Sequence, residues 1–300
     1  MSTAATPAFR CQAVLVQAFA AGPFQGNGAA VVQLAQPADH AWMQGLAASL
    51  QQSETAFLWR QPAGEWALRW FTPSCEVPLC GHATLGATLA LAHWGLLGPG
   101  DTLRLCTRSG GLQVQLECQE PPQASLVLPS GPLQPLPPPA YLQALLNGSV
   151  EAYWGSELGY RVALLSPRVP LEELPSPAPV LQGQDRQGLV LMQAASGKPP
   201  LLFGQAADYQ LRFFAPGLGI EEDPVTGSAH ALVAPWWMQH LGRRRVVGWQ
   251  SSARRGGMLC EHAEAGLVRL SGSGHLLWDG QIHAGSCGSD GPGWQVCHAG

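Results

Sequence analysis

The chain has 300 residues, of which 46% are hydrophobic and 12% are charged. This length fits two domains or one large domain, and the apolar fraction is large enough for a real core. A net charge of −4, with a single three-residue basic cluster at Arg243–Arg245, argues against a nucleic-acid partner or an anionic membrane surface.

The cysteine spacing, the N-terminal residues and the longest apolar run bear on where in the cell the protein is expected. The eight cysteines form no C-x-x-C pair, and the first residues contain no apolar signal-peptide segment. The longest apolar run, residues 83–97, is too short to span a membrane and contains His93. We therefore expect a soluble, cytoplasmic protein with free thiols and no membrane partner.

Short β-rich runs separated by Gly and Pro predict most of the strands. In chain order they are 11–19, 29–34, 55–59, 66–71, 102–107, 112–118, 124–129, 161–167, 188–194 and 209–216. A helix is expected near 140–147, another follows the last of these runs, and further strands lead toward the C-terminus.

A proline-rich segment, PSGPLQPLPPPA at 129–140, predicts the domain boundary, because it can join neither a helix nor a central strand. We expect an N-terminal domain at 1–129 and a C-terminal domain at 130–284. Residues 285–300 are rich in Gly and Ser and are expected to be a disordered tail.

The two halves contain a similar stretch. Residues 69–95 and 212–242 both run Arg-aromatic-Phe-x-Pro, an acid-bearing loop, a Gly followed by small residues, and an apolar helix. The shared order of features favours an internal repeat over chance similarity. Pro235 lies inside the second helix, where a kink or an early break is expected.

Each predicted helix is apolar on nearly every face, so it must be surrounded by protein. The short strands before and after each helix can enclose it. The sequence therefore predicts an α+β fold of two similar domains, each a strongly bent sheet or barrel around a central helix.

Both helices begin at a small residue: Gly81 followed by His82, and Gly227 followed by Ser228. Uncovered backbone N–H groups and the helix dipole at such a start favour a carboxylate or phosphate, which predicts a small anionic substrate. His82 is expected to be neutral there, because a helix start lowers the pKa of an imidazole.

Three further features leave alternatives open. Asp223, before the second helix, is either a capping residue or a site residue. Glu54 begins an apolar strand after Ser53, and on pattern alone it is an exposed strand-end acid. P-loop, dinucleotide and serine-hydrolase motifs are absent and the histidines show no ligand spacing, so neither cofactor nor metal is expected.

The blocks FQGNGAAVV, SETAFL, CGHATLGA and EEDPVTGSAHAL, in this order, resemble the PhzF-like (phenazine biosynthesis-like) family, including its animal branch. The resemblance covers residues 12–284. It implies a diaminopimelate-epimerase-like fold with pseudo-two-fold symmetry, an active site between the two domains, and a homodimer.

The resemblance also assigns roles. It implies a cofactor-independent isomerase in which Glu54 is the general acid/base, taking a proton from one carbon of a small cyclic or amino carboxylic acid and returning it to another. His82 and Asp223 would complete the catalytic set. Ser53, Gly81, Gly227 and Ser228 would bind the substrate.

Two alternatives remain. Related racemases use a cysteine at each helix start; here Cys80 precedes Gly81, but the corresponding place in the second half holds Asp223. An amino-acid racemase, epimerase or dehydratase, in which Cys80 and Glu54 exchange the Cα proton, is therefore a second interpretation. A non-catalytic binding or regulatory protein on the same fold is the third, because fold does not fix function.

Overall fold

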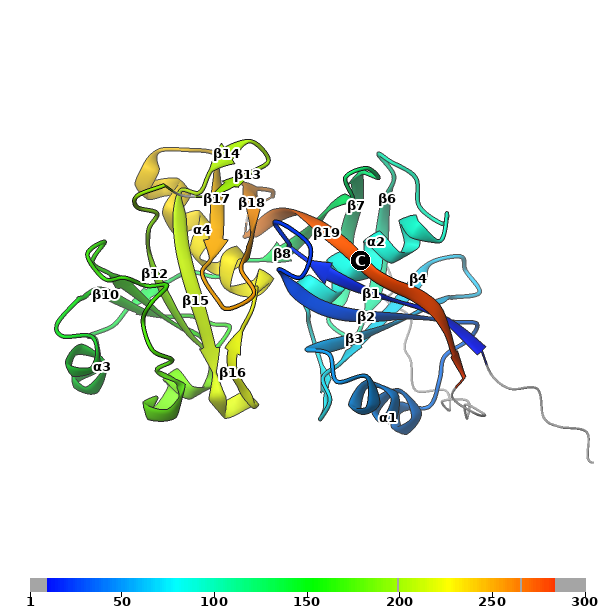
Figure 1. Cartoon of the computed structure of the whole chain (residues 1–300), viewed down its shortest axis with the longest axis horizontal. Helices are drawn as coiled ribbons and strands as arrows, with labels where there is room; N and C mark the ends of the chain where they lie inside the picture. The colour runs from blue at the N-terminus through cyan, green and yellow to red at the C-terminus, as the bar shows by residue number, and fades with distance from the viewer. Residues whose placement is uncertain (1–9, 199, 265, 284–300) are drawn as a thin grey trace, which may run out of the picture. The chain divides into compact units, whose positions relative to one another are not determined.

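The computed structural model describes residues 10–198, 200–264 and 266–283 (Figure 1). The chain divides into two compact units. Unit 1 contains the described residues through Ala18, Gly28–Leu126 and the described residues from Ser273, whereas unit 2 contains Phe19–Asn27 and Val127–Gly272.

Three segments therefore fall on the other side of the division from the one expected with a single boundary after residue 129. Residues 19–27 and 127–129 lie in unit 2. The described residues from Ser273 lie in unit 1, since they belong to a strand that pairs with the first strand of the chain. The predicted tail, 285–300, lies outside the described residues.

In unit 1 the strands close into a barrel. They are β1 (Arg10–Ala18), β2 (Asn27–Leu34), β3 (Glu54–Arg60), β4 (Trp66–Phe71), β5 (Glu76–Val77), β6 (Thr102–Thr107), β7 (Gly110–Cys118), β8 (Gln123–Pro129) and the last part of β19 (Leu267–His283). The pairings run β1–β2–β3–β4–β6–β7–β8–β19 and return to β1, while β5 pairs with β4 alone. Within this circuit β2–β3 and β4–β6 are parallel, and β3–β4, β6–β7 and β7–β8 are antiparallel.

The central helix of unit 1 is α2 (Gly81–His93), and every residue from Gly81 to Ala92 is buried. It contacts β1, β3 and β7, and Figure 1 shows it among the strands of the barrel. Because no face of the helix is polar, burial on all sides is the stable arrangement. The sequence prediction of a sheet wrapped around this helix is confirmed.

A helix that the sequence analysis missed, α1 (His40–Leu50), covers the outside of the barrel and contacts β3 and β4. Trp42, Met43 and Leu46 lie on the face that packs against the strands. Their spacing of three to four residues is the helical signal that could have identified it.

Unit 2 repeats the same order of pairings. Its strands are β9 (Gln134–Pro135), β10 (Val150–Gly155), β11 (Arg161–Leu165), β12 (Leu189–Ala194), β13 (Leu201–Leu202), β14 (Gln205–Ala206), β15 (Tyr209–Ala215), β16 (Ile220–Asp223), β17 (Arg245–Gln250), β18 (Gly256–His262) and the first part of β19. The main sheet has β11–β12 and β15–β17 parallel, and β12–β15, β15–β16, β17–β18 and β18–β19 antiparallel. Taken in the same order, each of these six pairings is parallel or antiparallel like its counterpart in unit 1. The counterparts are β2–β3, β4–β6, β3–β4, β4–β5, β6–β7 and β7–β8. The internal repeat is therefore confirmed.

The helices of unit 2 are α3 (Ala140–Leu145), the 3-10 helices η1 (Ala178–Val180), η2 (Gly183–Gln187) and η3 (Pro216–Leu218), and the central α4 (Gly227–Leu241). α4 contacts β17 and β18. Pro235 does not break it, because the helix continues to Leu241 and ends at Gly242 in the left-handed conformation, with φ of 64°. The expected early break is therefore wrong.

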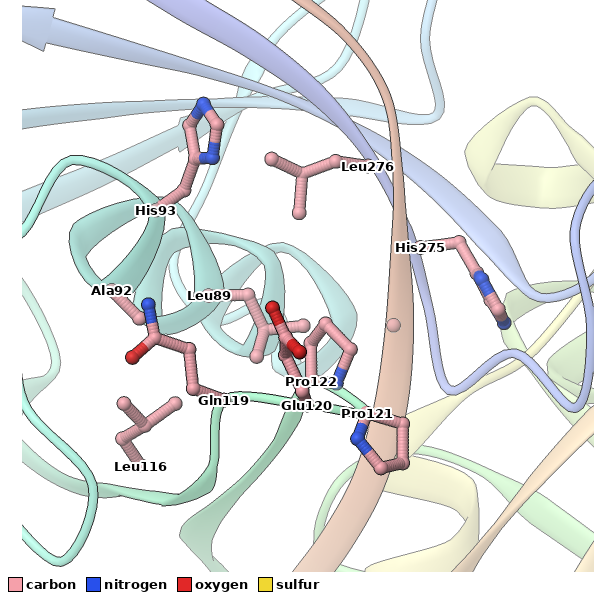
Figure 2. A pocket seen from close by; sticks show the side chains of 11 residues that line it. Leu89, Ala92, His93, Leu116, Gln119, Glu120, Pro121, Pro122, His275 and Leu276 are labelled. Atoms are coloured by element: carbon pink, nitrogen blue, oxygen red, sulfur yellow. The ribbon is translucent and has the colours of Figure 1, made fainter.

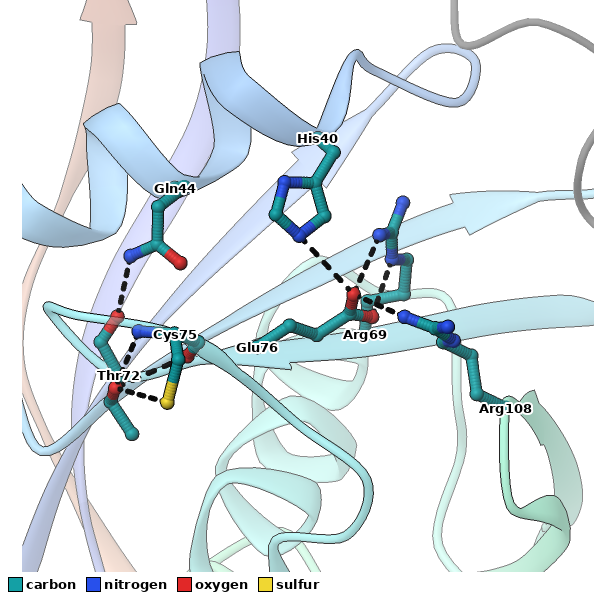
Figure 3. Close-up of polar contacts among 7 residues, drawn as sticks. All are labelled: His40, Gln44, Arg69, Thr72, Cys75, Glu76 and Arg108. Atoms are coloured by element: carbon teal, nitrogen blue, oxygen red, sulfur yellow. Dashed lines mark hydrogen bonds and ion pairs between the residues drawn. The ribbon is translucent and has the colours of Figure 1, made fainter. Parts of the chain in front are cut away.

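A buried ion pair fixes the loop before α2 (Figure 3). Arg69 of β4 donates from Nε and Nη2 to the two carboxylate oxygens of Glu76, each at 2.8 Å. Arg108 donates to the same carboxylate at 2.6 Å, and His40 lies 3.5 Å from it. Burial raises the pKa of Glu76, but the two arginines outweigh burial and lower it.

Unit 2 contains the same ion pair. Arg212 of β15 donates from Nε and Nη2 to Glu222 at 2.7 and 2.8 Å, and its guanidinium lies over the Phe214 ring. Arg69 lies over Phe71 in the same way. Bidentate Arg–carboxylate pairs are geometrically specific, so each holds the segment that leads into a central helix.

A second buried contact joins α4 to the sheet of unit 2. The Tyr209 hydroxyl lies 2.8 Å from His230 Nδ1, and both side chains are fully buried. Gly248 leaves the room for this contact, because a Cβ there would lie 2.4 Å from both His230 Nδ1 and the Tyr209 hydroxyl.

All six cysteines among the described residues are free thiols. In the part of the chain that the structure describes, no helix combines the length and the apolar character needed to cross a membrane.

We predict that Gly248→Ala lowers the free energy of unfolding by about 1–3 kcal/mol, because the added methyl group overlaps the Tyr209–His230 contact. Gly86→Ala in α2 is the matched control, since its Cβ would meet Ala29 at an ordinary 3.4 Å. Alanine favours a helix by about 1 kcal/mol over glycine, so this change should be neutral or stabilising. Urea unfolding measures both, and equal losses would contradict the assignment.

The stability of the fold should depend on pH through the buried His230. Burial lowers the pKa of His230 to about 3, whereas the pKa of a histidine in the unfolded chain is about 6.5. Between these values the unfolded chain binds a proton that the folded chain does not, so stability falls as the pH drops from about 6.5 toward about 3. In urea unfolding over this range, His230→Gln should flatten the dependence and the exposed His262→Gln should not. An unchanged slope in His230→Gln would contradict the prediction.

Candidate active site

Glu54 is the first residue of β3 and is 8% exposed. Its parallel partner on β2 is Ala29, and the half-buried Ser53 precedes it. The pattern-based interpretation of an exposed strand-end acid is therefore wrong. A buried carboxylate is costly unless a charged or polar group lies beside it.

His82 is that group. Its Nε2 lies 3.0 Å from Glu54 Oε2, and its Nδ1 lies 3.5 Å from the Cys80 sulfur. Cys80 is the extended residue before α2, and Gly81 begins the helix without a side-chain cap. The ring of His82 is therefore held between a carboxylate and a thiol at the start of a buried helix.

Burial lowers the pKa of His82, but the Cys80 sulfur and the Glu54 carboxylate outweigh it, and the pKa lies well above its ordinary value. This direction is opposite to the one expected from the helix start alone. Burial, followed by the charge of Glu54, raises the pKa of Cys80 to about 11, so that it stays a thiol at neutral pH.

Asp223 in unit 2 is held by hydrogen bonds rather than capping α4. The carboxamide of Asn27 donates to one of its carboxylate oxygens at 2.7 Å, and the Thr226 hydroxyl donates to the other. The N-cap residue of α4 is Thr226, and its side chain makes no capping hydrogen bond. The capping alternative for Asp223 is wrong, whereas its catalytic role stays a prediction.

Gln250 fixes the segment between Asp223 and α4. This fully buried side chain donates to the Asp223 carbonyl at 2.7 Å and accepts from the Thr226 N–H at 2.8 Å. At the start of the helix, the Ser228 hydroxyl lies 3.2 Å from that of Tyr160. The first turn of α4, from Gly227, is therefore held in a defined position.

The strand registers relate the two halves residue by residue. Thr55 pairs with Phe71 on β4, and Leu189 pairs with Phe214 on β15, so Glu54 corresponds to Gly188. The repeat therefore carries the buried acid in one half only.

The helix starts correspond as well: Cys80 matches Thr226, and His82 matches Ser228. The residue in the place of Cys80 is thus Thr226, not Asp223 as the sequence analysis assumed. No second thiol occupies this place.

Four residues that hold this region were not predicted from the sequence: Asn27, Thr226, Gln250 and Tyr160. Asn27 stands inside the FQGNGAAVV block, which could have indicated it. Gln250 had no local signal, because its partners lie 24 and 27 residues earlier in the chain.

Unit 1 has a separate pocket at the other end of α2, with a volume of about 410 Å³ (Figure 2). Leu89, Leu116 and Leu276 supply apolar walls, and His93 and Glu120 lie among its polar lining residues. Since α2 rises about 1.5 Å per residue, His93 is about 18 Å along the helix from Gly81. The pocket contains none of the predicted site residues.

Comparisons with known proteins define the family. The sequence model described as "Phenazine biosynthesis-like protein" matches residues 16–146 and 164–280. An uncharacterized isomerase of Pseudomonas aeruginosa is 37% identical over 271 residues, covering 89% of this chain and 97% of its own. The human phenazine biosynthesis-like domain-containing protein is 33% identical over 290 residues, covering 90% and 98%.

Solved structures agree. A phenazine biosynthesis protein of the PhzF family from Enterococcus faecalis has a TM-score of 0.79 at 30% identity, covering 91% of this chain and 99% of its own. A hydroxyproline epimerase from Agrobacterium vitis has a TM-score of 0.60 at 12% identity, covering 92% and 95%, and shares the fold alone. The fold is therefore that of the diaminopimelate-epimerase-like enzymes. The chain belongs to the phenazine biosynthesis-like (PhzF) family, and it is an isomerase.

We predict that Gln250→Leu lowers the free energy of unfolding by about 2–4 kcal/mol, because it leaves the Thr226 N–H and the Asp223 carbonyl unsatisfied. Gln193→Leu is the matched control, since the Gln193 side-chain oxygen is already buried without a hydrogen-bond partner. This control should cost less than about 1 kcal/mol. Urea unfolding compares the two, and equal costs would contradict the role of Gln250.

Proposed function

We propose that this isomerase moves a proton on a small carboxylic acid, cyclic or α-amino, without a bound cofactor. Glu54 takes the proton from one carbon and returns it to the substrate. The observation that carries this proposal is a buried carboxylate in contact with a histidine at the start of a buried helix.

The geometry of His82 supports a positioning role. Its Nε2 lies 3.0 Å from Glu54 Oε2 and its Nδ1 lies 3.5 Å from the Cys80 sulfur, so both contacts restrict the orientation of the ring. General acid/base catalysis needs a carboxylate held within hydrogen-bond reach of the reacting carbon. His82 holds Glu54 in one place through the reaction.

The start of α2 supports binding of the substrate's carboxylate. Gly81 has no side chain, and the N-cap residue Cys80 makes no side-chain capping hydrogen bond. The first N–H groups and the helix dipole favour an anion there. Ser53, Asp223, Gly227 and Ser228 keep their predicted roles, and the homodimer and cytoplasmic location also stay predictions.

One observation favours a second candidate, a racemase or epimerase in which Cys80 exchanges the proton. Its sulfur lies 3.5 Å from His82 Nδ1 and within 4.8 Å of a Glu54 carboxylate oxygen. Burial raises the pKa of Cys80 to about 11, and only a thiolate would take a proton. We therefore favour Glu54.

Deuterium exchange tests the choice. The protein is incubated in D2O with a panel of small amino and hydroxy carboxylic acids, and loss of C–H signals is followed by proton NMR. For a compound that exchanges, Glu54→Gln should lower the rate about 10²–10⁴-fold, because it removes the acid/base and keeps the shape.

Two further variants decide the outcome. The exposed Glu117→Gln, in the same unit, should exchange at the wild-type rate. Cys80→Ser should retain most of the exchange. Exchange at the wild-type rate in Glu54→Gln would overturn the proposal. Loss of exchange in Cys80→Ser, with exchange retained in Glu54→Gln, would favour the second candidate.

A further inference from the structure

A possible metal-binding group, which the spacing of the sequence did not predict, is formed by Glu54, Cys80 and His82. One ligand atom from each lies within 4.8 Å of the other two. Cys80 and His82 are buried, with 5% and 4% of each residue exposed, and the Glu54 side chain is 11% exposed. No second group of this kind occurs in the described part of the chain.

The separations are close to those of a tetrahedral metal site. Zinc lies about 2.3 Å from sulfur and about 2.0–2.2 Å from nitrogen or oxygen, which puts neighbouring ligand atoms about 3.3–3.6 Å apart. Here His82 Nε2 is 3.0 Å from Glu54 Oε2 and 3.9 Å from the Cys80 sulfur. The Cys80 sulfur lies within 4.8 Å of a Glu54 carboxylate oxygen. Changes in the side-chain torsions of Cys80 and Glu54 would bring the three ligand atoms to the separations of a metal site.

We propose that Glu54, Cys80 and His82 bind one divalent cation of the zinc class. A thiol and an imidazole select a thiophilic metal, whereas magnesium and calcium prefer oxygen ligands. Three protein ligands leave a fourth position open for water or a small anion.

Charge at the site allows such a cation. The start of α2 carries a partial positive charge that opposes it. On binding, the Cys80 thiol and the Nε2–H of His82 release their protons to solvent, and the thiolate then joins the Glu54 carboxylate. Two negative ligands balance the charge of the cation, and the neutral imidazole completes the set.

The bound cation would be coordinated by the carboxylate oxygen of Glu54 that faces His82, so this oxygen could no longer accept a proton. If Glu54 is the acid/base, as proposed above, the metal inhibits the enzyme at its own site. This consequence rests on the proposed function, whereas the binding itself does not.

Cobalt(II) is the probe, because it replaces zinc and gives optical bands. The full-length protein is freed of metal with a chelator and titrated with Co²⁺, in a Cys287→Ser/Cys297→Ser background so that these two thiols do not contribute. We expect one cobalt per chain, with a near-ultraviolet thiolate-to-metal band and the visible bands of tetrahedral cobalt.

Cys80→Ser should abolish the near-ultraviolet band, and the exposed Cys75→Ser, in the same unit, should retain it. His82→Asn and Glu54→Gln should each weaken Co²⁺ binding at least about tenfold. Circular dichroism checks that each variant is folded, with Cys80→Ala as the substitute if Cys80→Ser is not.

Absence of the thiolate band in the wild type, or its persistence in folded Cys80→Ser, would overturn the site. Neither outcome depends on turnover, so failure of the metal site leaves the proton-transfer proposal standing. Conversely, an unaffected exchange rate in Glu54→Gln leaves the cobalt result intact.

Discussion

The constraint on which the structure depends is the need to enclose a helix that has no polar face. Every residue of α2 from Gly81 to Ala92 is buried, so strands must surround it on all sides. This enclosure also buries whatever lies at the helix start. His82 and Glu54 are consequently withdrawn from water and placed 3.0 Å apart.

The same constraint operates twice, yet the chemistry differs between the halves. Both units keep the order of strand pairings and a bidentate Arg–Glu pair before the central helix. The register places Gly188 where unit 1 has Glu54, and the helix starts place Thr226 where unit 1 has Cys80. A duplicated scaffold thus holds the candidate acid/base in one half, and a hydrogen-bonded Asp223 in the other.

Several features were accessible from sequence because their signals are local. The starts of α2 and α4 at Gly81 and Gly227, and the repeat, follow from glycine, proline and apolar spacing. The burial of Glu54 was not accessible, since it depends on a helix that begins 27 residues later. The Asn27–Asp223 bond joins residues 196 apart, which no local pattern predicts.

The proposed mechanism requires Glu54 to carry the moving proton. A crystal structure with a bound small carboxylic acid that undergoes exchange would show whether it can. We expect a Glu54 carboxylate oxygen within about 3.5 Å of the exchanging carbon, and the acid's carboxylate at the start of α2. A carbon that instead lies against the Cys80 sulfur, with Glu54 out of reach, would contradict it.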